Sequence, residues 1–117
     1  MKVYGIKNCD TVKKALKWLD GHKINYEFHD FKKSGVSVQK LEEWAAETGW
    51  EPLLNKRGTT WRKLDAGTQA SIQTQADALN LMQEKTSVIK RPVIEGGSKL
   101  ILGFDENSYQ QILLENN

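Results

Sequence analysis

The residue with the clearest chemical potential is Cys9, the only cysteine among 117 residues. It follows the short apolar run of Val3, Tyr4 and Ile6 and precedes a segment with helical periodicity, so we expect it at a strand-to-helix turn. A thiol at a helix N-terminus faces unpaired backbone N–H groups and a partial positive charge, and both favour the thiolate. An unperturbed cysteine, with a pKa of about 8.5, is only about 3% thiolate at pH 7. The position therefore predicts an activated, nucleophilic cysteine.

The residues around Cys9 are polar, which favours an accessible thiol over a buried cysteine that packs as a small apolar side chain. Lys7 and Lys13 would favour the thiolate, whereas Asp10 would oppose it. The polar neighbours are Lys7, Asn8, Asp10 and Thr11.

The segment Cys9-Asp10-Thr11-Val12 lacks the second thiol of a C-x-x-C motif. A mixed disulfide at Cys9 must therefore be resolved by an outside thiol, and glutathione is the expected one. Such a cycle requires no bound metal, flavin or nucleotide. We expect glutathione to serve as reductant or co-substrate, with a disulfide or a glutathionylated molecule as the partner.

The composition, 38% apolar and 27% charged, is that of an ordinary soluble globular protein. The sequence has no apolar run near the roughly 18 residues of a membrane span and no signal-peptide pattern, so we expect a cytoplasmic protein with no membrane partner. One cysteine forms no internal disulfide and no multi-cysteine zinc site. The net charge of +2 disfavours nucleic-acid binding.

Hydrophobic periodicity predicts β-α-β-α over the first fifty residues. The first helix has its apolar positions at 12, 15, 16 and 19, with Asp10 or Thr11 as its cap and Gly21 as its stop. A second strand is expected over residues 24–31. A second helix is expected from the cap Ser37 to Gly49.

The second half predicts helices followed by β-β-α. We expect a helical insertion over about residues 50–87, including one helix over residues 69–83 whose inner face is Ile72, Ala76, Leu79 and Met82. The pair Gly96-Gly97 between apolar runs predicts a hairpin, and a final helix with Asp105 as its cap follows it. The whole chain, residues 1–117, is expected to be one domain, because some forty residues hardly bury a core alone.

This order of elements resembles a thioredoxin-like α/β fold with a helical insertion between its two halves. Four motifs in the same order resemble the arsenate reductase (ArsC-type) family, and within it the Spx/YffB branch. They are Tyr4 with Cys9, Leu53-Leu54-Asn55-Lys56, Lys90-Arg91-Pro92-Val93, and Gly103-Phe104-Asp105. The resemblance implies a reactive cysteine after the first strand, at Cys9, and a cis-proline at Pro92 beside it.

The resemblance also implies three arginines that hold the arsenate oxyanion, and this chain matches them only in part. Arg91 matches one. Asn55 stands at the second position, with Arg57 two residues on, and Leu102 stands at the third. The histidine that precedes the family's reactive loop is Gly5 here. These departures argue against efficient arsenate reduction.

The sequence therefore predicts a glutathione-dependent thiol-disulfide reductase with Cys9 as its catalytic residue. The alternatives are an Spx-like regulator that binds RNA polymerase and a glutathione- or glutaredoxin-dependent arsenate reductase. His22 and His29 belong to no metal-spaced pair, so no metal site is expected, and we interpret the four tryptophans as packing residues. The residues expected to bind substrate or glutathione are Lys7, Asn8, Thr11, Arg57, Arg91 and Pro92.

Overall fold

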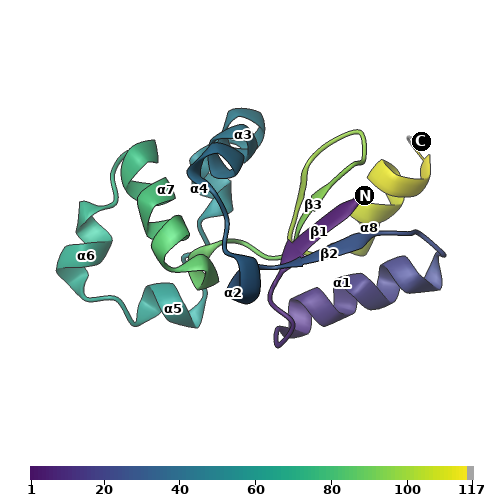
Figure 1. Cartoon of the computed structure of the whole chain (residues 1–117), viewed down its shortest axis with the longest axis horizontal. Coiled ribbons are helices and arrows are strands. Elements are labelled where there is room, and N and C mark those ends of the chain that lie inside the picture. Colours follow the sequence, from purple (N-terminus) through teal and green to yellow (C-terminus); the bar gives the residue numbers. More distant parts are fainter. Residues whose placement is uncertain (116–117) are drawn as a thin grey trace. The chain divides into compact units, whose positions relative to one another are not determined.

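The computed structural model describes residues 1–115 of the chain, which divide into two compact units (Figure 1). The first unit consists of Met1–Ser34 together with the chain from Arg91 onward, and the second spans Gly35–Lys90. The second unit includes the predicted insertion over residues 50–87 and also the helix before it. The expectation of one domain stays a prediction.

The first unit is built on a mixed sheet with the strand order β2-β1-β3-β4. β1 pairs with β2 in parallel and with β3 in antiparallel, and β3 and β4 form an antiparallel hairpin. This arrangement confirms the predicted β-α-β start and the predicted β-β hairpin. The strands are β1 (Lys2–Gly5), β2 (Glu27–Asp30), β3 (Val93–Glu95) and β4 (Ile101–Leu102).

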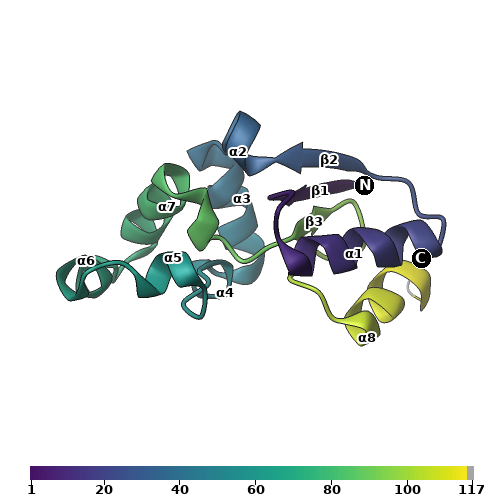
Figure 2. The same cartoon turned by 90° about the horizontal axis from the view of Figure 1, so that it is seen from below.

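Two helical segments lie on the same side of this sheet, as Figure 2 shows. They are α1 (Asp10–Gly21) and α8 (Glu106–Tyr109), and α8 is continued by the π-helical turn η2 (Gln110–Glu115). The buried cluster between sheet and helices comprises Val3, Ala15, Leu19, Ile94, Ile101, Tyr109 and Leu113. Burial of these side chains is the main stabilising contribution, about 1.5–3 kcal/mol for each large side chain.

The start of α1 differs from the prediction. The N-cap is Cys9, in an extended conformation with φ −141° and ψ 121°, and Asp10 is already the first helical residue. The prediction that Asp10 or Thr11 caps the helix was therefore wrong. The carboxylate of Asp10 lies in the first turn instead, where an acidic side chain is favourable beside the helix dipole.

The caps expected for two other helices are confirmed. The hydroxyl of Ser37 accepts a hydrogen bond from the backbone N–H of Lys40 at the start of α3 (Val38–Thr48), which ends at Gly49 with φ +86°. The carboxylate of Asp105 accepts a hydrogen bond from the backbone N–H of Ser108 at the start of α8. A short helix, α2 (Phe31–Ser34), directly follows β2.

The second unit is helical, as expected, with one difference. The helix predicted over residues 69–83 is two helices, because Thr74 and Asp77 form a capping box that starts a new helix. Ala76 is exposed, so its predicted inward position was wrong, whereas Ile72 is half-buried between the two helices. The helices after α3 are α4 (Trp50–Leu53), α5 (Thr59–Arg62), α6 (Ala66–Ser71), α7 (Gln75–Glu84) and the 3-10 turn η1 (Thr86–Val88).

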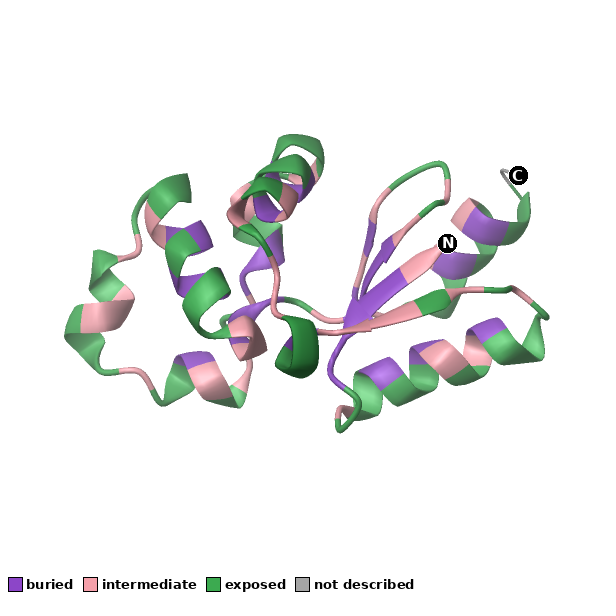
Figure 3. Ribbon diagram, in the orientation of Figure 1, coloured by how far each residue is buried: buried purple, intermediate pink, exposed green. Residues whose placement is uncertain are grey.

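Burial follows the inner faces of these helices and the strands β1 and β3 (Figure 3). In α7 the buried residues are Ala78, Leu79, Leu81 and Met82. Trp44 and Trp61 are buried, which confirms their interpretation as packing residues, and Trp18 and Trp50 are half-buried. None of the helices in residues 1–115 has the length and apolar character needed to cross a membrane.

Candidate functional site

The candidate site is centred on Cys9, whose half-buried thiol stands at the N-terminus of α1. The Cys9 carbonyl accepts the first helical hydrogen bond, from the N–H of Lys13 at 2.9 Å. The side chain of an N-cap residue faces the N–H groups of the second and third helical residues, which here are Thr11 and Val12. A thiolate at this position is therefore stabilised by backbone donors that no helical carbonyl uses.

Arg91 is the second component of the site. Burial of the thiol raises its pKa, but the Val12 N–H, the hydrogen bond and charge of Arg91, and the Thr11 N–H together hold the pKa of Cys9 below its ordinary value. In the structure the Cys9 side chain makes no capping hydrogen bond. We regard the N–H groups as donors to the thiolate, because negative charge strengthens such hydrogen bonds. The direction of the shift agrees with the activated cysteine predicted from the sequence.

Gly5 explains how closely the first turn of α1 packs against the end of β1. A Cβ atom at this buried position would lie 2.9 Å from Cγ2 and 3.3 Å from Cγ1 of Val12. A side chain there would push Val12 away, and with it the backbone N–H that faces the thiol. The position where the ArsC-type resemblance implies a histidine therefore has no room for one in this chain.

The peptide bond between Arg91 and Pro92 is cis, as the resemblance implied. The Pro92 carbonyl accepts a hydrogen bond from the N–H of Gly103 at 2.8 Å. The carbonyl of Gly103 in turn accepts one from the buried hydroxyl of Tyr109 at 2.6 Å. Because Gly103 has φ +78°, a conformation that favours glycine, the motif Gly103-Phe104-Asp105 supports the backbone beside Arg91.

The chain that leads into Arg91 is held within the second unit. The N–H of Lys90 donates to the Leu53 carbonyl at 2.7 Å, and the N–H of Asn55 donates to the Val88 carbonyl at 2.8 Å. These bonds flank an antiparallel bridge between residues 54 and 89. The motif that begins at Leu53 therefore fixes the backbone immediately before Arg91.

The structure brings Cys9, Thr11 and Arg91 together, with Pro92 next to Arg91 in the chain. Lys7 and Asn8 are exposed in the loop before Cys9. Arg57 belongs to the second unit, where its N–H donates to the Asn55 side chain at 3.2 Å, and its role in the site stays a prediction.

Sequence reasoning missed the contribution of the Val12 backbone N–H. The signal was available: once Cys9 is taken as the N-cap, Val12 occupies the third helical position, where capping hydrogen bonds are donated.

The two histidines take part in ring stacking. The His22 ring lies 3.9 Å from that of Trp18, and the His29 ring lies 4.8 Å from that of Tyr4. Within residues 1–115, no three or more His, Cys, Asp or Glu side chains are arranged to hold a metal ion.

Comparison with solved structures supports the fold. The chain is 46% identical to the protein YffB, with a TM-score of 0.89 over 96% of this chain and 97% of that one. It is 45% identical to an arsenate reductase (ArsC) related protein from Brucella melitensis, with a TM-score of 0.74 over 93% of this chain and 90% of that one. The fold is therefore the thioredoxin-like α/β fold of these proteins.

Comparison with curated sequences identifies the family. An uncharacterised protein of Haemophilus influenzae is 46% identical over 92% of this chain and 94% of its own length. The global transcriptional regulator Spx of Streptococcus mutans is 26% identical over 91% of this chain and 77% of its own length. The model of the ArsC family matches residues 4–112, so the chain belongs to the ArsC family.

Proposed function

We propose that this protein is a glutathione-dependent thiol-disulfide reductase that uses Cys9 as its one reacting thiol. The observation that carries the proposal is the position of Cys9 at the N-terminus of α1 beside Arg91, where its pKa is lowered, in a chain with no second cysteine. A lowered pKa provides the thiolate, which is the attacking species in disulfide exchange. The similarity of this chain to the arsenate reductase (ArsC) related protein from Brucella melitensis supports an oxidoreductase function in general terms.

The proposed cycle acts on a glutathionylated substrate. The Cys9 thiolate attacks the glutathione sulfur of the mixed disulfide, and the substrate thiolate leaves and takes a proton from solvent. A second glutathione thiolate then attacks the glutathione sulfur bound to Cys9, which releases oxidised glutathione and restores the Cys9 thiolate. In sum, one mixed disulfide and one glutathione thiol become one substrate thiol and one glutathione disulfide.

The residues of the chain have separate roles in this cycle. The Arg91 charge and the N–H groups of Thr11 and Val12 stabilise the Cys9 thiolate both as attacking and as leaving group. We expect Lys7, Asn8, Thr11, Arg57, Arg91 and Pro92 to bind glutathione or the substrate. A reducing, glutathione-rich cytoplasm is the compartment in which this cycle would run.

Glutathione uptake by Cys9 tests the proposal. The wild-type protein treated with oxidised glutathione should gain one glutathione per chain by mass spectrometry, and reduced glutathione should remove it. Catalytic reduction of a glutathionylated peptide should follow under the same conditions, and Cys9→Ser should lack both activities. A Cys9 that takes up glutathione without any turnover would contradict the enzyme assignment.

A regulatory role is the second candidate, and the similarity to the Streptococcus mutans regulator Spx favours it. In this alternative the protein binds RNA polymerase as Spx-type regulators do. Those regulators resemble this chain but typically carry a redox C-x-x-C, whereas Val12 occupies the second cysteine position here. Capture of polymerase subunits by the purified protein, together with absent glutathione turnover, would favour the regulator.

Arsenate reduction is the third candidate, and the site favours it least. Only Arg91 of the three expected arginines is matched, with Asn55 and Leu102 at the other positions. Each lost charge-assisted contact costs about 1.5–3 kcal/mol, so two lost contacts should slow the reaction about a hundredfold or more. Negligible arsenate turnover by the wild-type protein is the expected result, and robust turnover would reverse this ranking.

A further inference from the structure

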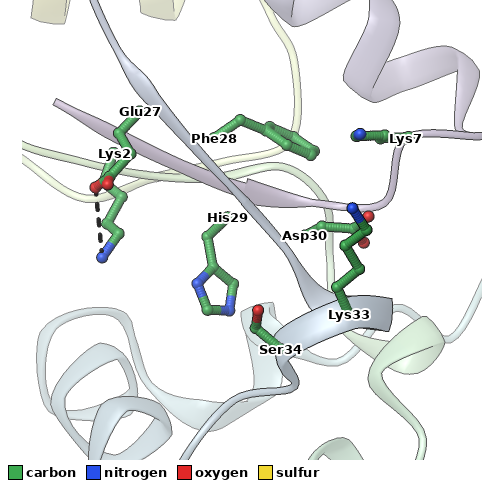
Figure 4. A pocket seen from close by; sticks show the side chains of 8 residues that line it. All are labelled: Lys2, Lys7, Glu27, Phe28, His29, Asp30, Lys33 and Ser34. Carbon is green, nitrogen blue, oxygen red and sulfur yellow. Dashed lines mark ion pairs between the residues drawn. The ribbon is translucent and has the colours of Figure 1, made fainter.

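A hollow of about 380 Å³ runs along the outer side of β2 in the first unit. Its lining includes Lys2 and Glu27 at the start of the strand, Phe28, and Lys7, Asp30 and Lys33 at the end. Figure 4 shows Lys7, Asp30 and Lys33 grouped where β2 leads into α2, with the Lys2–Glu27 ion pair at the opposite end. The volume is within the range of about 300–1,000 Å³ that small-ligand sites occupy.

The backbone of β2 provides hydrogen-bonding groups along this hollow. β2 is the last strand in the sheet order, and among residues 1–115 it pairs with β1 alone. The N–H of Glu27 donates to the Met1 carbonyl, which is on the β1 side. Because successive strand residues direct their backbone groups to opposite sides, those of Phe28 and Asp30 face the open side. This edge can accept one more strand.

The charges at the two ends of the hollow are different. At the start of β2, the Lys2 amino group lies 3.6 Å from the Glu27 carboxylate, so these charges largely neutralise each other. At the other end, Lys7 and Lys33 face a single carboxylate, that of Asp30, which accepts a hydrogen bond from the Lys32 N–H at 2.9 Å. This second end of the hollow therefore carries excess positive charge. It is also connected to the reactive thiol through the chain, because Cys9 follows Lys7 by two residues.

We propose that this edge binds an extended acidic segment of the disulfide substrate. The segment adds to the sheet as a strand beside β2 and places a carboxylate between Lys7 and Lys33. Strand addition supplies affinity through main-chain hydrogen bonds, and the lysines select acidic sequences. Calling the segment part of the substrate rests on the proposed function, whereas the binding itself does not.

The sizes and charges favour this occupant over a second copy of the chain. β2 has four residues, so four residues of an extended segment, about 13 Å long, match it. Parallel pairing of β2 with β2 of another copy would place the two lysine-rich ends side by side, where like charges repel. Antiparallel pairing would place each lysine-rich end beside the paired Lys2 and Glu27 of the other copy, which offers its excess charge no carboxylate. An acidic segment removes that repulsion.

Peptide binding to the full-length Cys9→Ser protein tests the proposal without any thiol chemistry. The probe is acetyl-Glu-Val-Glu-Val-amide, and its neutral match is acetyl-Gln-Val-Gln-Val-amide, both titrated while amide NMR signals are followed. The signals of Phe28 and Asp30 should shift most with the acidic peptide. The neutral peptide should bind several-fold more weakly, and N-methylation on the side of the probe that faces β2 should abolish binding.

Lysine variants connect the binding to the charged end. Lys33→Gln should weaken binding of the acidic peptide about two- to fivefold, as expected for a partly exposed ion pair. This loss of affinity should be smaller at high salt. Lys14→Gln, an exposed lysine on α1 outside the hollow, is the matched control and should leave the affinity unchanged. Circular dichroism of each variant confirms that the fold is retained.

Three results would overturn the inference. The first is equal affinity for acidic and neutral peptides, and the second is signal shifts at β3 or β4 in place of β2. The third is a concentration-dependent rise in mass with shifts at β2 in the absence of peptide, which would assign the edge to a second copy. Failure of the proposed function gives a different pattern, since peptide binding to Cys9→Ser would persist while the wild-type protein shows no turnover.

Discussion

Replacing Arg91 tests the electrostatic explanation of the reactive thiol most directly. Arg91 acts on Cys9 through both a hydrogen bond and its charge. Arg91→Gln removes the charge and keeps a donor, and Arg91→Lys keeps a charge and removes the planar guanidinium. We expect the pKa of Cys9 to rise in both variants, and to rise more in Arg91→Gln.

The expected size follows from the exposure of the site. A hydrogen bond to a charged group contributes about 1.5–3 kcal/mol when it is well buried, and an exposed ion pair about 0.2–1 kcal/mol. The Cys9 thiol is half-buried, so we take about 1 kcal/mol for the interaction. This corresponds to roughly fivefold less thiolate at a pH below the pKa of the thiol.

The rate changes less than the thiolate fraction, because a more basic thiolate is a better nucleophile. With a Brønsted coefficient of about 0.4–0.5, the intrinsic reactivity should rise about twofold in Arg91→Gln. The net effect is a two- to threefold slower alkylation at low pH and a plateau about twofold higher at high pH. The rate profiles of the wild-type protein and the variant should therefore cross.

Iodoacetamide alkylation followed by mass spectrometry over the range from about pH 5 to pH 10 measures these profiles. Lys99→Gln, an exposed lysine in the hairpin loop, serves as the control for a general change of charge. Superimposed profiles for the wild-type protein and Arg91→Gln would refute the role of Arg91. Parallel profiles that never cross would show that Arg91 affects access to the thiol and not its basicity.

Three further predictions concern Gly5, Tyr109 and Cys9 itself. Gly5→Ala should cost about 1–3 kcal/mol in urea unfolding and slow Cys9 alkylation, because the new Cβ displaces Val12; unchanged stability would show that the contact relaxes freely. Tyr109→Phe should cost about 1–3 kcal/mol by removing its hydrogen bond to Gly103. Because burial raises the pKa of Tyr109, the wild-type protein should also lose stability as pH rises above 10.0, where Tyr109 ionises only in the unfolded chain, and the phenylalanine variant should lose less stability over the same range. Because the pKa of Cys9 is lowered, stability relative to Cys9→Ser should rise with pH from that pKa up to the ordinary pKa of a free cysteine, and a flat difference would contradict the shift.

The periodic elements were predictable from the sequence, because their apolar spacing reports burial directly. β1, α1, α3 and the β3–β4 hairpin were expected where they occur. The prediction placed one helix across the boundary between α6 and α7, because it followed the apolar positions on both sides of Thr74. Thr74 and Asp77 are instead the polar residues of a capping box, which starts α7. Local polar chemistry decided that boundary, and the apolar period did not.

The site was predictable only in part. The position of Cys9 after a strand indicated a helix N-terminus, but cysteine is not a preferred cap, so the sequence favoured Asp10 or Thr11. The absence of a side chain at Gly5 lets Val12 of α1 pack closely against the end of β1, next to the cap Cys9. Such a contact depends on the packing of a helix against a strand, which local sequence does not specify.

The backbone on either side of Arg91 is held by hydrogen bonds of residues with no chemistry of their own. On one side of Arg91, the Lys90 N–H donates to the Leu53 carbonyl, and on the other the Gly103 N–H donates to the Pro92 carbonyl. Two of the motifs that resemble the ArsC family thus hold the backbone on either side of the arginine, although neither supplies a reacting group. Asn55 and Leu102, which stand where the resemblance implies two further arginines, take no part in this support. Arg91 is thus held beside the thiol in a chain that matches only one of the three oxyanion arginines, which agrees with the proposed disulfide substrate better than with arsenate.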